Sequence, residues 1–519
     1  MNTKKILPLL CLLLILSLTN TFAQTSIDYQ AKGDAAIAGK DYKNALADYN
    51  LAIKTNDKKD KKQLAVLYFS CGIAQVDLEL FDEALKSYTK AIELDPKMRS
   101  AYWNRGVINQ KNNKFQAAVD DYNNAILTTN AREGDGGLEV LYTNIAFNQM
   151  QLHQLDKALA ADSTAISINP GYTRAYIGRA DIYVEQQNYK LADSDYTTAI
   201  NASQNEDVHL VSYIFALRGD TRLNRKLYKD AINDYSYALV IDPDQKVAYW
   251  NRGAAYHLNG DYSLAVDNYA KAITYYQGDN QSLSKLYDNK ALNELGMNAY
   301  DKAIQDDSVA ISLDATNNIA WFNKANAYTQ KGDYAEGIEC YKQMLKFAKD
   351  NKRSKAILYY EIANNEYFLN QFDKVVADCS TAISLYPEYA DSYYYRAKVY
   401  LKKLDKKDQA MADFNKVIAL DTSKKTVSYI FSLLYTGKTD DAIAILTNDL
   451  LTADNATALT DYYNLACLYA IINKPDEANI YLKKAIDNGY AKKYAMADED
   501  LENIRNTDDY KSTMAGAAN

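Results

Sequence analysis

Residues 65–98 read AVLYFSCGIAQVDLELFDEALKSYTKAIELDPKM, with small residues at Gly72, Ala84 and Ala91. If Ala65 is position 1, these are positions 8, 20 and 27. Steps that alternate between 34 and 38 to 40 residues separate the small residues at position 8, which are Gly33, Gly72, Gly106, Ala146, Ala180, Gly219, Gly253, Ala291, Ala325, Ala363 and Ala397. A period of this size is typical of a solenoid, in which one supersecondary unit is stacked many times.

Within each unit the spacing of small and apolar residues follows the 3.6-residue period of a helix, and no strand-like alternation competes with it. Each unit is therefore predicted to be two short helices that touch at their small residues. Turns such as the one at Gly260 or Gly332 separate the helices, because glycine readily takes the positive φ that ends a helix.

This pattern, with an aromatic residue at position 4, Tyr or Phe at position 24 and Pro at position 32, resembles the tetratricopeptide repeat (TPR) family. In residues 65–98 the matching residues are Tyr68, Gly72, Ala84, Tyr88, Ala91 and Pro96. We count thirteen copies, beginning near residues 26, 65, 99, 139, 173, 212, 246, 284, 318, 356, 390, 423 and 459. The resemblance implies an all-α solenoid, a right-handed superhelix of antiparallel helix pairs, over residues 24–490.

Alternating steps give a super-unit of two repeats, 72 to 74 residues long, and the extra residues before even-numbered copies are expected to extend the next helix or its loop. The late copies depart from the pattern, with an extra residue near Lys406 and with Ile430 where a small residue is expected. After Gly489 the pattern stops. Residues 491–519 are predicted to form a capping helix and tail, with a polar helix over residues 498–505.

The first 23 residues have the pattern of a secretory signal peptide: Lys4 and Lys5, an apolar run of 13 residues, and small residues before Gln24. We therefore expect an exported protein, either periplasmic, outer-membrane-associated or secreted. Loss of this leader lowers the formal net charge from −8 to about −10. No later segment is apolar enough to span a bilayer, and an acidic chain without a basic cluster predicts no nucleic-acid partner.

The motifs of catalysis are missing from the sequence. It contains no P-loop, nucleophile elbow, HExxH or dinucleotide fingerprint, and the histidines His153, His209 and His257 fall in different copies. We therefore predict a non-enzyme with no catalytic residue, no cofactor and no metal site. Cys340 and Cys379 occupy nearly equivalent places in adjacent copies. They could form a disulfide, or they could be two small buried residues with free thiols.

Position 7 is basic in eight copies, and each of these copies has an acid at or near position 22 or 23. The pairs are Lys32 with Asp48, Arg105 with Asp120 or Asp121, Arg179 with Asp195, Arg218 with Asp234, Arg252 with Asp267, Lys290 with Asp306, Lys324 with Glu339, and Arg396 with Asp413. Position 7 lies on the face expected to pack against the second helix, and a buried charge there needs a partner. We therefore favour structural ion pairs over a ladder that binds an anionic ligand.

A second ladder lies on the opposite face of the first helices, formed by positions 2, 5, 6, 9, 12 and 13, which we call the groove face. Its asparagines at position 6 are Asn104, Asn144, Asn251, Asn289, Asn323 and Asn464, and its aromatic residues at position 5 include Trp103, Trp250, Phe322 and Tyr394. In the TPR family this face is concave and binds extended peptides, and an amide both donates to and accepts from a peptide backbone. The alternative is that asparagine is tolerated on a solvated face and that the aromatic residues pack between repeats.

Chaperone-binding members of the family hold a carboxylate with Lys, Asn and Arg at set places in three repeats. Here only the middle asparagine matches, Asn104. The positions at which its basic and amide partners are expected hold Phe69, Ile73 and Val140 instead. Binding to chaperone termini is therefore not implied. The expected function is a scaffold or adaptor of the cell envelope that binds peptides or proteins in its groove. A carbohydrate-binding solenoid and a rigid spacer remain the alternatives, and the pattern predicts no particular oligomeric state.

Overall fold

The computed structural model describes residues 26–56, 60–129, 137–348, 351–450, 455–490 and 492–515. The chain divides into two compact units, residues 1–261 and 262–519. The predicted leader, residues 1–23, lies outside the described residues. None of the helices in the described part is both long enough and apolar enough to cross a membrane.

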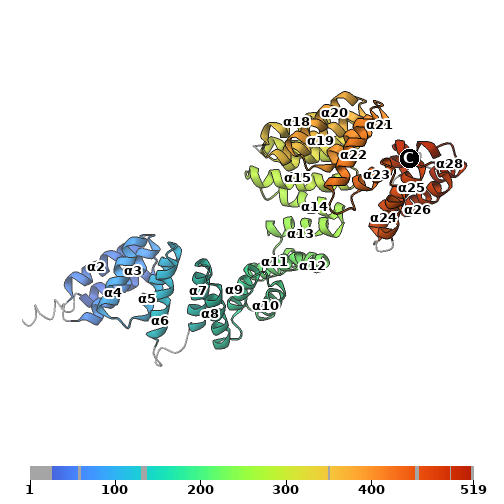
Figure 1. Cartoon of the computed structure of the whole chain (residues 1–519). Coiled ribbons are helices and arrows are strands. Elements are labelled where there is room, and N and C mark those ends of the chain that lie inside the picture. The colour runs from blue at the N-terminus through green and yellow to red at the C-terminus, as the bar shows by residue number, and fades with distance from the viewer. Residues whose placement is uncertain are drawn as a thin grey trace, which may run out of the picture. The chain divides into compact units, whose positions relative to one another are not determined.

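Unit 1 is a series of helices joined by short turns (Figure 1). A helix over residues 26–38 is followed by α2 (Tyr42–Thr55), α3 (Lys61–Asp77), α4 (Phe81–Leu94), α5 (Arg99–Lys111), α6 (Phe115–Leu127), α7 (Leu138–Gln151), α8 (Leu155–Ile168), α9 (Thr173–Glu185), α10 (Tyr189–Ala202), α11 (Val208–Asn224), α12 (Tyr228–Ile241) and α13 (Lys246–Asn259). Each helix packs mainly on its neighbours in sequence.

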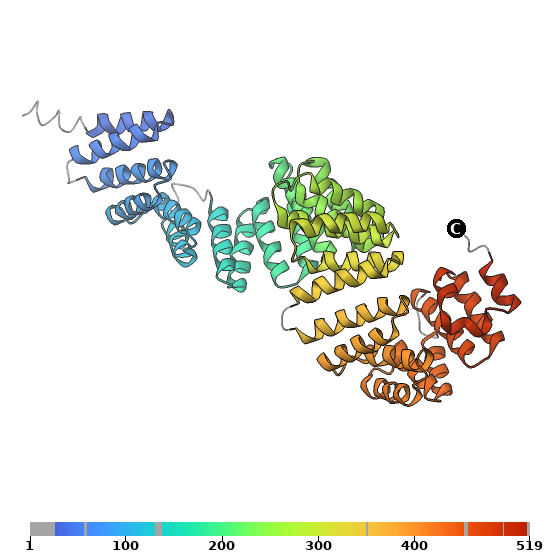
Figure 2. The same ribbon diagram turned by 90° about the horizontal axis from the view of Figure 1, so that it is seen from above.

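Unit 2 continues the same pattern, and Figure 2 shows its helices stacked in sequence order. They are α14 (Tyr262–Ile273), α15 (Asn280–Gly296), α16 (Tyr300–Leu313), α17 (Asn318–Lys331), α18 (Tyr334–Phe347), α19 (Lys352–Phe368), α20 (Phe372–Leu385), α21 (Ala390–Lys402), α22 (Lys407–Leu420), α23 (Val427–Tyr435), α24 (Thr439–Leu450), α25 (Asn455–Ile471), α26 (Pro475–Asp487), α27 (Lys492–Ala497), the 3₁₀ helix η2 (Glu499–Ile504) and α28 (Asp508–Met514). The predicted all-α solenoid is confirmed.

The two helices of a repeat touch where a small residue faces an aromatic ring. A Cβ atom on Gly106 in α5 would lie 2.8 Å from Cε1 of Tyr122 in α6, closer than a real Cβ atom comes to a ring. Tyr122 has no exposed surface. Glycine at position 8 therefore lets the helices approach closely enough to bury the tyrosine at position 24. The recurrence of small residues at position 8 and aromatic residues at position 24 follows from this contact.

Extra residues extend the first helix of the second, sixth, eighth and tenth repeats, as predicted, whereas α7 of the fourth repeat has only 14 residues. The helices α3, α11, α15 and α19 have 17 residues each, whereas α5, α9 and α21 have 13. An N-cap side chain accepts a hydrogen bond from a backbone N–H at the start of each extended helix, namely Asp60, Asp207, Asp279 and Asn351.

Basic residues at position 7 join three helices. In α9 the Arg179 Nε lies 2.7 Å from Asp195 Oδ2 on α10, and Nη1 lies 3.4 Å from Ser163 Oγ on α8 of the preceding repeat. The same arrangement links Arg105 with Asp121 and Thr89, Arg218 with Asp234 and Thr197, and Arg396 with Asp413 and Ser380. The hydroxyl at position 25 of the preceding repeat is a partner that the sequence analysis missed.

The guanidinium groups also lie over aromatic rings at position 4, for example Arg105 over Tyr102 at 5.7 Å. Lys290 pairs with Asp306, as the covariation suggests. Arg252 Nη1 donates to Ser236 Oγ over 3.1 Å. Its pairing with Asp267 stays a prediction, as do the pairs Lys32 with Asp48 and Lys324 with Glu339.

The late repeats are irregular where the sequence departs from the pattern. Arg396 and Asp413 are 17 residues apart instead of 16, because the turn before α22 holds an additional residue and Asp405 there takes a φ of 49°. The helix that carries Ile430, α23, has only nine residues. The polar segment 498–505, expected to be a regular helix, is the short 3₁₀ helix η2 followed after a turn by α28.

The cysteines Cys71, Cys340, Cys379 and Cys467 are free and buried, so the structure contains the thiol alternative for Cys340 and Cys379 and not the disulfide. Burial raises the pKa of Cys340 to about 11. At neutral pH this thiol is protonated and unreactive, in agreement with a small core residue.

Candidate functional site

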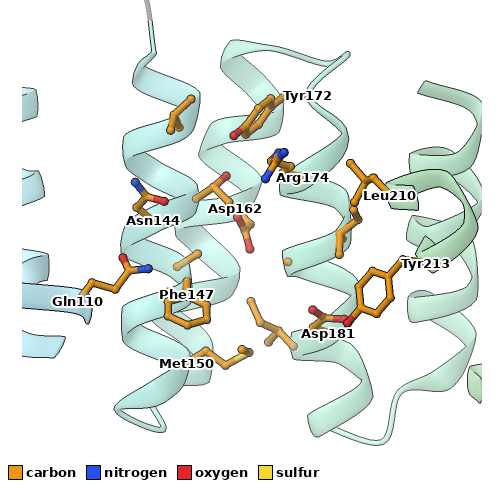
Figure 3. A pocket seen from close by; sticks show the side chains of 16 residues that line it. Gln110, Asn144, Phe147, Met150, Asp162, Tyr172, Arg174, Asp181, Leu210 and Tyr213 are labelled. Carbon is orange, nitrogen blue, oxygen red and sulfur yellow. The ribbon is translucent and has the colours of Figure 1, made fainter. Parts of the chain in front are cut away.

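A cavity of about 480 Å³ opens on the groove face of unit 1, between α7 and α9. Figure 3 shows the side chains that line it, which include Gln110, Asn144, Phe147, Met150, Asp162, Tyr172, Arg174, Asp181, Leu210 and Tyr213. They come from five helices, α5, α7, α8, α9 and α11, and from the turn before α9. The cavity therefore belongs to the stack of repeats and not to a single one.

The cavity exists because position 24 of the fourth repeat is Asp162 where most repeats have an aromatic residue. In neighbouring repeats Tyr122 and Tyr196 fill this place and are fully buried. An aspartate is much smaller than a tyrosine, and in a closely packed interior the difference is left as empty space. Ala146, the small residue at position 8 that a ring would cover, lines the cavity instead.

Gly178 on α9 leaves the space that the Asp162 carboxylate occupies. A Cβ atom at Gly178 would lie 2.5 Å from Asp162 Oδ2, so a larger residue would displace the acid. Position 6 of the third repeat holds Asn104, and its Nδ2 lies 3.4 Å from the hydroxyl of Tyr88, the position-24 residue of the repeat before. Asp162 and Gly178 thus replace a Tyr and Asn pair at this one junction.

The Asp162 carboxylate is buried and incompletely satisfied. The residue is only 1% exposed, and its Oδ1 has no hydrogen-bond partner. Burial raises the pKa of Asp162 to about 8, although the Thr143 hydroxyl and the Arg179 guanidinium favour the charged form. A buried acid in a cavity with a strongly raised pKa is a candidate for a functional site.

A second acid, Asp181 at position 9 of α9, lines the cavity beside Asp162 (Figure 3). It accepts a hydrogen bond from the hydroxyl of Tyr196, and burial raises its pKa above the usual value for aspartate. Both acids would be stabilised in their charged form by a cation that entered the cavity, because an opposite charge nearby offsets the cost of desolvation.

The walls of the cavity are apolar and partly open to solvent. Phe147 on α7 is 43% exposed and Tyr213 on α11 is 50% exposed, although both are large apolar side chains. Together with Met150 they offer surface for the methylene stem of a long side chain, and the two rings can also attract a cation. The site therefore combines a buried acidic end with partly apolar sides and one exposed cation, Arg174, and its two acids can accept a lysine or arginine side chain.

Several of the predicted groove asparagines form hydrogen bonds with residues of the preceding repeat. Asn251 Nδ2 donates to Asp220 Oδ1 and Asn323 Nδ2 donates to Asp288 Oδ1, both over 2.8 Å. Asn323 and Asn464 are 6% and 8% exposed. Asn144 lines the cavity, while Asn289 lies half-buried on α15 and its backbone carbonyl accepts from Asn293. Peptide binding by the six asparagines stays a prediction.

Trp103 and Asn104 lie together on the groove face, in a second cavity of about 420 Å³ with Phe69, Arg99 and Ser100. The Arg99 guanidinium lies 5.4 Å from the Trp103 ring. The other predicted aromatic residues differ in exposure: Trp250 is half-buried on α13, Phe322 is 38% exposed and packs against Tyr341, and Tyr394 packs against Phe414.

Sequence reasoning missed Asp162, Gly178, Asp181, Phe147 and Tyr213. The available signal was an acid at position 24, where the family pattern requires an aromatic residue. The same departure occurs at Asp307 in the eighth repeat, where burial raises the pKa to about 9 and neither carboxylate oxygen has a partner. Nowhere in the described ranges do His, Cys, Asp and Glu side chains form a group that could hold a metal ion.

Comparison with known families decides what the repeats are. Models described as "Tetratricopeptide repeat" match residues 173–206, 247–279, 319–351, 391–421 and 462–488, and a model described as "TPR repeat" matches residues 74–113 and 219–260. The chain is a tetratricopeptide repeat protein. The matched segments that begin at residues 173, 247, 319 and 391 start within one residue of copies counted from the sequence. TPR proteins generally serve as protein-interaction scaffolds.

Relatives of this TPR protein are distant. Human "Tetratricopeptide repeat protein 6" is 22% identical over 324 residues, which are 56% of this chain and 60% of that protein. Human "DnaJ homolog subfamily C member 7" is 24% identical over 64% of this chain and 72% of its own length. Among solved structures, "YrrB: a TPR protein with an unusual peptide-binding site" is 21% identical and covers 38% of this chain and 95% of its own, with a TM-score of 0.31. These likenesses concern the fold.

Proposed function

We propose that this TPR protein is a non-catalytic scaffold or adaptor that binds a peptide or protein segment along the groove face of unit 1. The observation that supports this function is the cavity around Asp162, which opens on that face. The cavity lining contains no histidine or cysteine, and its two acids lie among apolar side chains such as Phe147, Met150 and Ile177 and polar ones such as Thr143 and Arg174. A cavity with apolar walls and a few polar groups is suited to holding a side chain.

The cavity gives the proposal a defined ligand chemistry. A lysine or arginine side chain of the partner enters between Phe147 and Tyr213, its stem contacts Met150 and Ile177, and its charge meets Asp162. Entry of the cation lowers the pKa of Asp162, so binding at neutral pH releases a proton. Affinity for the basic side chain therefore rises with pH until Asp162 is ionised in the free protein.

A library of random displayed peptides tests this proposal whatever the sequence of the partner is. Peptides selected on the wild-type chain are expected to contain lysine or arginine at one fixed place, and peptides selected on Asp162→Asn are not. The matched control is Asp156→Asn, since Asp156 is an exposed acid on the same helix, α8. Selection of peptides without a basic residue by the wild-type chain, or of the same peptides by Asp162→Asn, contradicts the proposal.

We also propose that the protein is exported and acts in the cell envelope. The support is the leader pattern of residues 1–23, with Lys4, Lys5 and the apolar run that follows. N-terminal sequencing of the protein from an envelope fraction is expected to begin at Gln24. A chain that keeps residues 1–23 and fractionates with the cytosol contradicts export.

A further inference from the structure

The C-terminal segment of the chain folds back onto the groove face of unit 2. Beyond α26, residues 498–504 form η2 and its N-cap, and Leu501 and Ile504 anchor this segment in the core cluster of the last repeats, with 0% and 1% exposure. The acidic residues Asp498, Glu499 and Asp500 precede the anchors. We call these three residues the acidic segment.

Lysine and tyrosine side chains hold the acidic segment at several points. The Tyr463 hydroxyl donates to Asp498 Oδ2 over 2.8 Å. Glu499 accepts from the Tyr367 hydroxyl over 2.9 Å and from Lys403 Nζ over 2.7 Å.

Asp500 lies deeper than the other two acids, at 7% exposure. Its carboxylate accepts a hydrogen bond from Lys398 Nζ over 3.2 Å and another from Lys402 Nζ. The Tyr435 hydroxyl lies 3.4 Å from the same carboxylate. Burial opposes the charge of Asp500, but the two ammonium groups outweigh it and lower the pKa of this acid. Asp500 is therefore ionised at neutral pH and fully paired.

Apart from Lys403 at position 14, the partners of the acidic segment occupy groove positions in successive repeats. Tyr367 is at position 12 of the tenth repeat, Lys398 and Lys402 are at positions 9 and 13 of the eleventh, Tyr435 is at position 13 of the twelfth, and Tyr463 is at position 5 of the thirteenth. These are positions of the face on which unit 1 has its cavity. The acidic segment thus lies across the first helices α19, α21, α23 and α25, as a bound peptide would.

Capping the solenoid does not explain these contacts. A cap must cover the apolar end of the last repeat, and Leu501, Ile504, Tyr510 and Met514 are buried in the core cluster that does so. Glu499 instead reaches Tyr367 on α19, 132 residues earlier in the chain. Covering the end of α26 requires neither a hydrogen bond to the tenth repeat nor ion pairs with the eleventh.

We infer that the groove face of repeats ten to thirteen is a binding site for an acidic peptide segment, and that residues 498–500 are its built-in occupant. A partner with a similar Asp-Glu-Asp segment competes with this occupant. The tether holds the internal segment at an effective concentration of roughly millimolar, so a partner must be present at high concentration or bind at additional points. This site is independent of the cavity around Asp162.

The test uses the full chain and a labelled peptide of residues 495–506, AMADEDLENIRN. We expect the peptide to bind the variant Glu499→Gln with Asp500→Asn at least tenfold more tightly than the wild-type chain, because the variant keeps Leu501 and Ile504 but releases the lysines. Adding Lys398→Gln and Lys402→Gln abolishes that gain. The control Glu502→Gln, an exposed acid of the same segment, binds the peptide as weakly as the wild-type chain does.

A second measurement needs no substitution. Hydrogen exchange of residues 498–506 in the wild-type chain is expected to speed up when the peptide is present in excess, and not with a peptide in which Gln and Asn replace Glu499 and Asp500. The inference is overturned if the folded variant with the free lysines does not bind the acidic peptide. If that variant does not fold, unchanged exchange in the wild-type chain overturns it.

Discussion

Asp162 on α8 and Gly178 on α9 are fitted to each other: a Cβ atom on Gly178 would lie 2.5 Å from Asp162 Oδ2. The two residues belong to successive repeats, and each departs from what other repeats carry at its position. An acid in place of a ring opens the cavity, and a glycine in place of a larger side chain leaves room for the acid. The site is therefore a property of a junction between repeats.

A double-mutant cycle measures this fit. Gly178 lies inside a helix, where replacement by alanine alone favours folding by about 1 kcal/mol, but the contact with Asp162 costs about 1–3 kcal/mol by overpacking. We expect Gly178→Ala to stabilise the chain clearly more in an Asp162→Ala background than in the wild type. Denaturant unfolding measures both effects, and additive changes would show that the two residues do not interact.

Substitution of the buried acid should change how stability depends on pH. The pKa of Asp162 in the folded chain is about 8, and the value in an unfolded chain is about 4. The folded state therefore holds an extra proton between these two pH values, and the free energy of unfolding falls as the pH rises through this window. The amide of the Asp162→Asn variant has no proton to lose, so the stability of this variant relative to the wild type should grow from about pH 4 to about pH 8, by at most about 1.4 kcal/mol per pH unit.

Thermal unfolding of both chains at several pH values checks this prediction. The control is again Asp156→Asn, whose side chain is exposed on α8. A constant difference for Asp162→Asn would mean that the carboxyl is ionised throughout.

The ion pair of the eleventh repeat offers a test of the basic ladder. Arg396 Nε lies 2.8 Å from Asp413 Oδ2, and the two side chains are 17% and 10% exposed. Arg396→Met leaves a buried carboxylate without its partner and should cost about 3–5 kcal/mol of stability, whereas Arg396→Met with Asp413→Leu should recover much of that loss. Equal losses in chemical denaturation would contradict the pairing.

Substitution of Trp103 distinguishes the proposed peptide binding from the alternative of carbohydrate binding. Its ring and the Arg99 guanidinium line the second cavity of unit 1. We expect Trp103→Ala to retain envelope glycans on an affinity matrix as the wild-type chain does. Loss of glycan retention in the folded variant would favour the carbohydrate alternative.

The fold was predictable because its determinants repeat. Gly106 and Tyr122 illustrate a contact that recurs many times, so the spacing of small and aromatic residues indicates the helix pair without any structure. The covariation of Arg179 with Asp195 is visible for the same reason. The hydroxyl of Ser163 was missed because it lies one repeat away from the arginine that it contacts.

The cavity and the acidic segment could not be predicted in the same way because each occurs at a single place. Asp162 differs from the pattern by one residue, and its effect depends on Gly178 in the next repeat. Lys402 and Asp500 are 98 residues apart in the chain. Their contact follows from the curvature of the stack and the length of the connection, which residue spacing does not reveal.

The arginines that reach back to a hydroxyl of the preceding repeat are distributed unevenly, so successive joints of the solenoid are linked by different chemistry. Arg179 and Arg218 tie the fourth, fifth and sixth repeats into one block. At the joint between the third and fourth repeats, position 7 is Ile145, which can form no such bond. At that joint the Asn148 Nδ2 donates instead to Gln110 Oε1 over 2.7 Å, so a neutral amide bond replaces the arginine link between the two repeats.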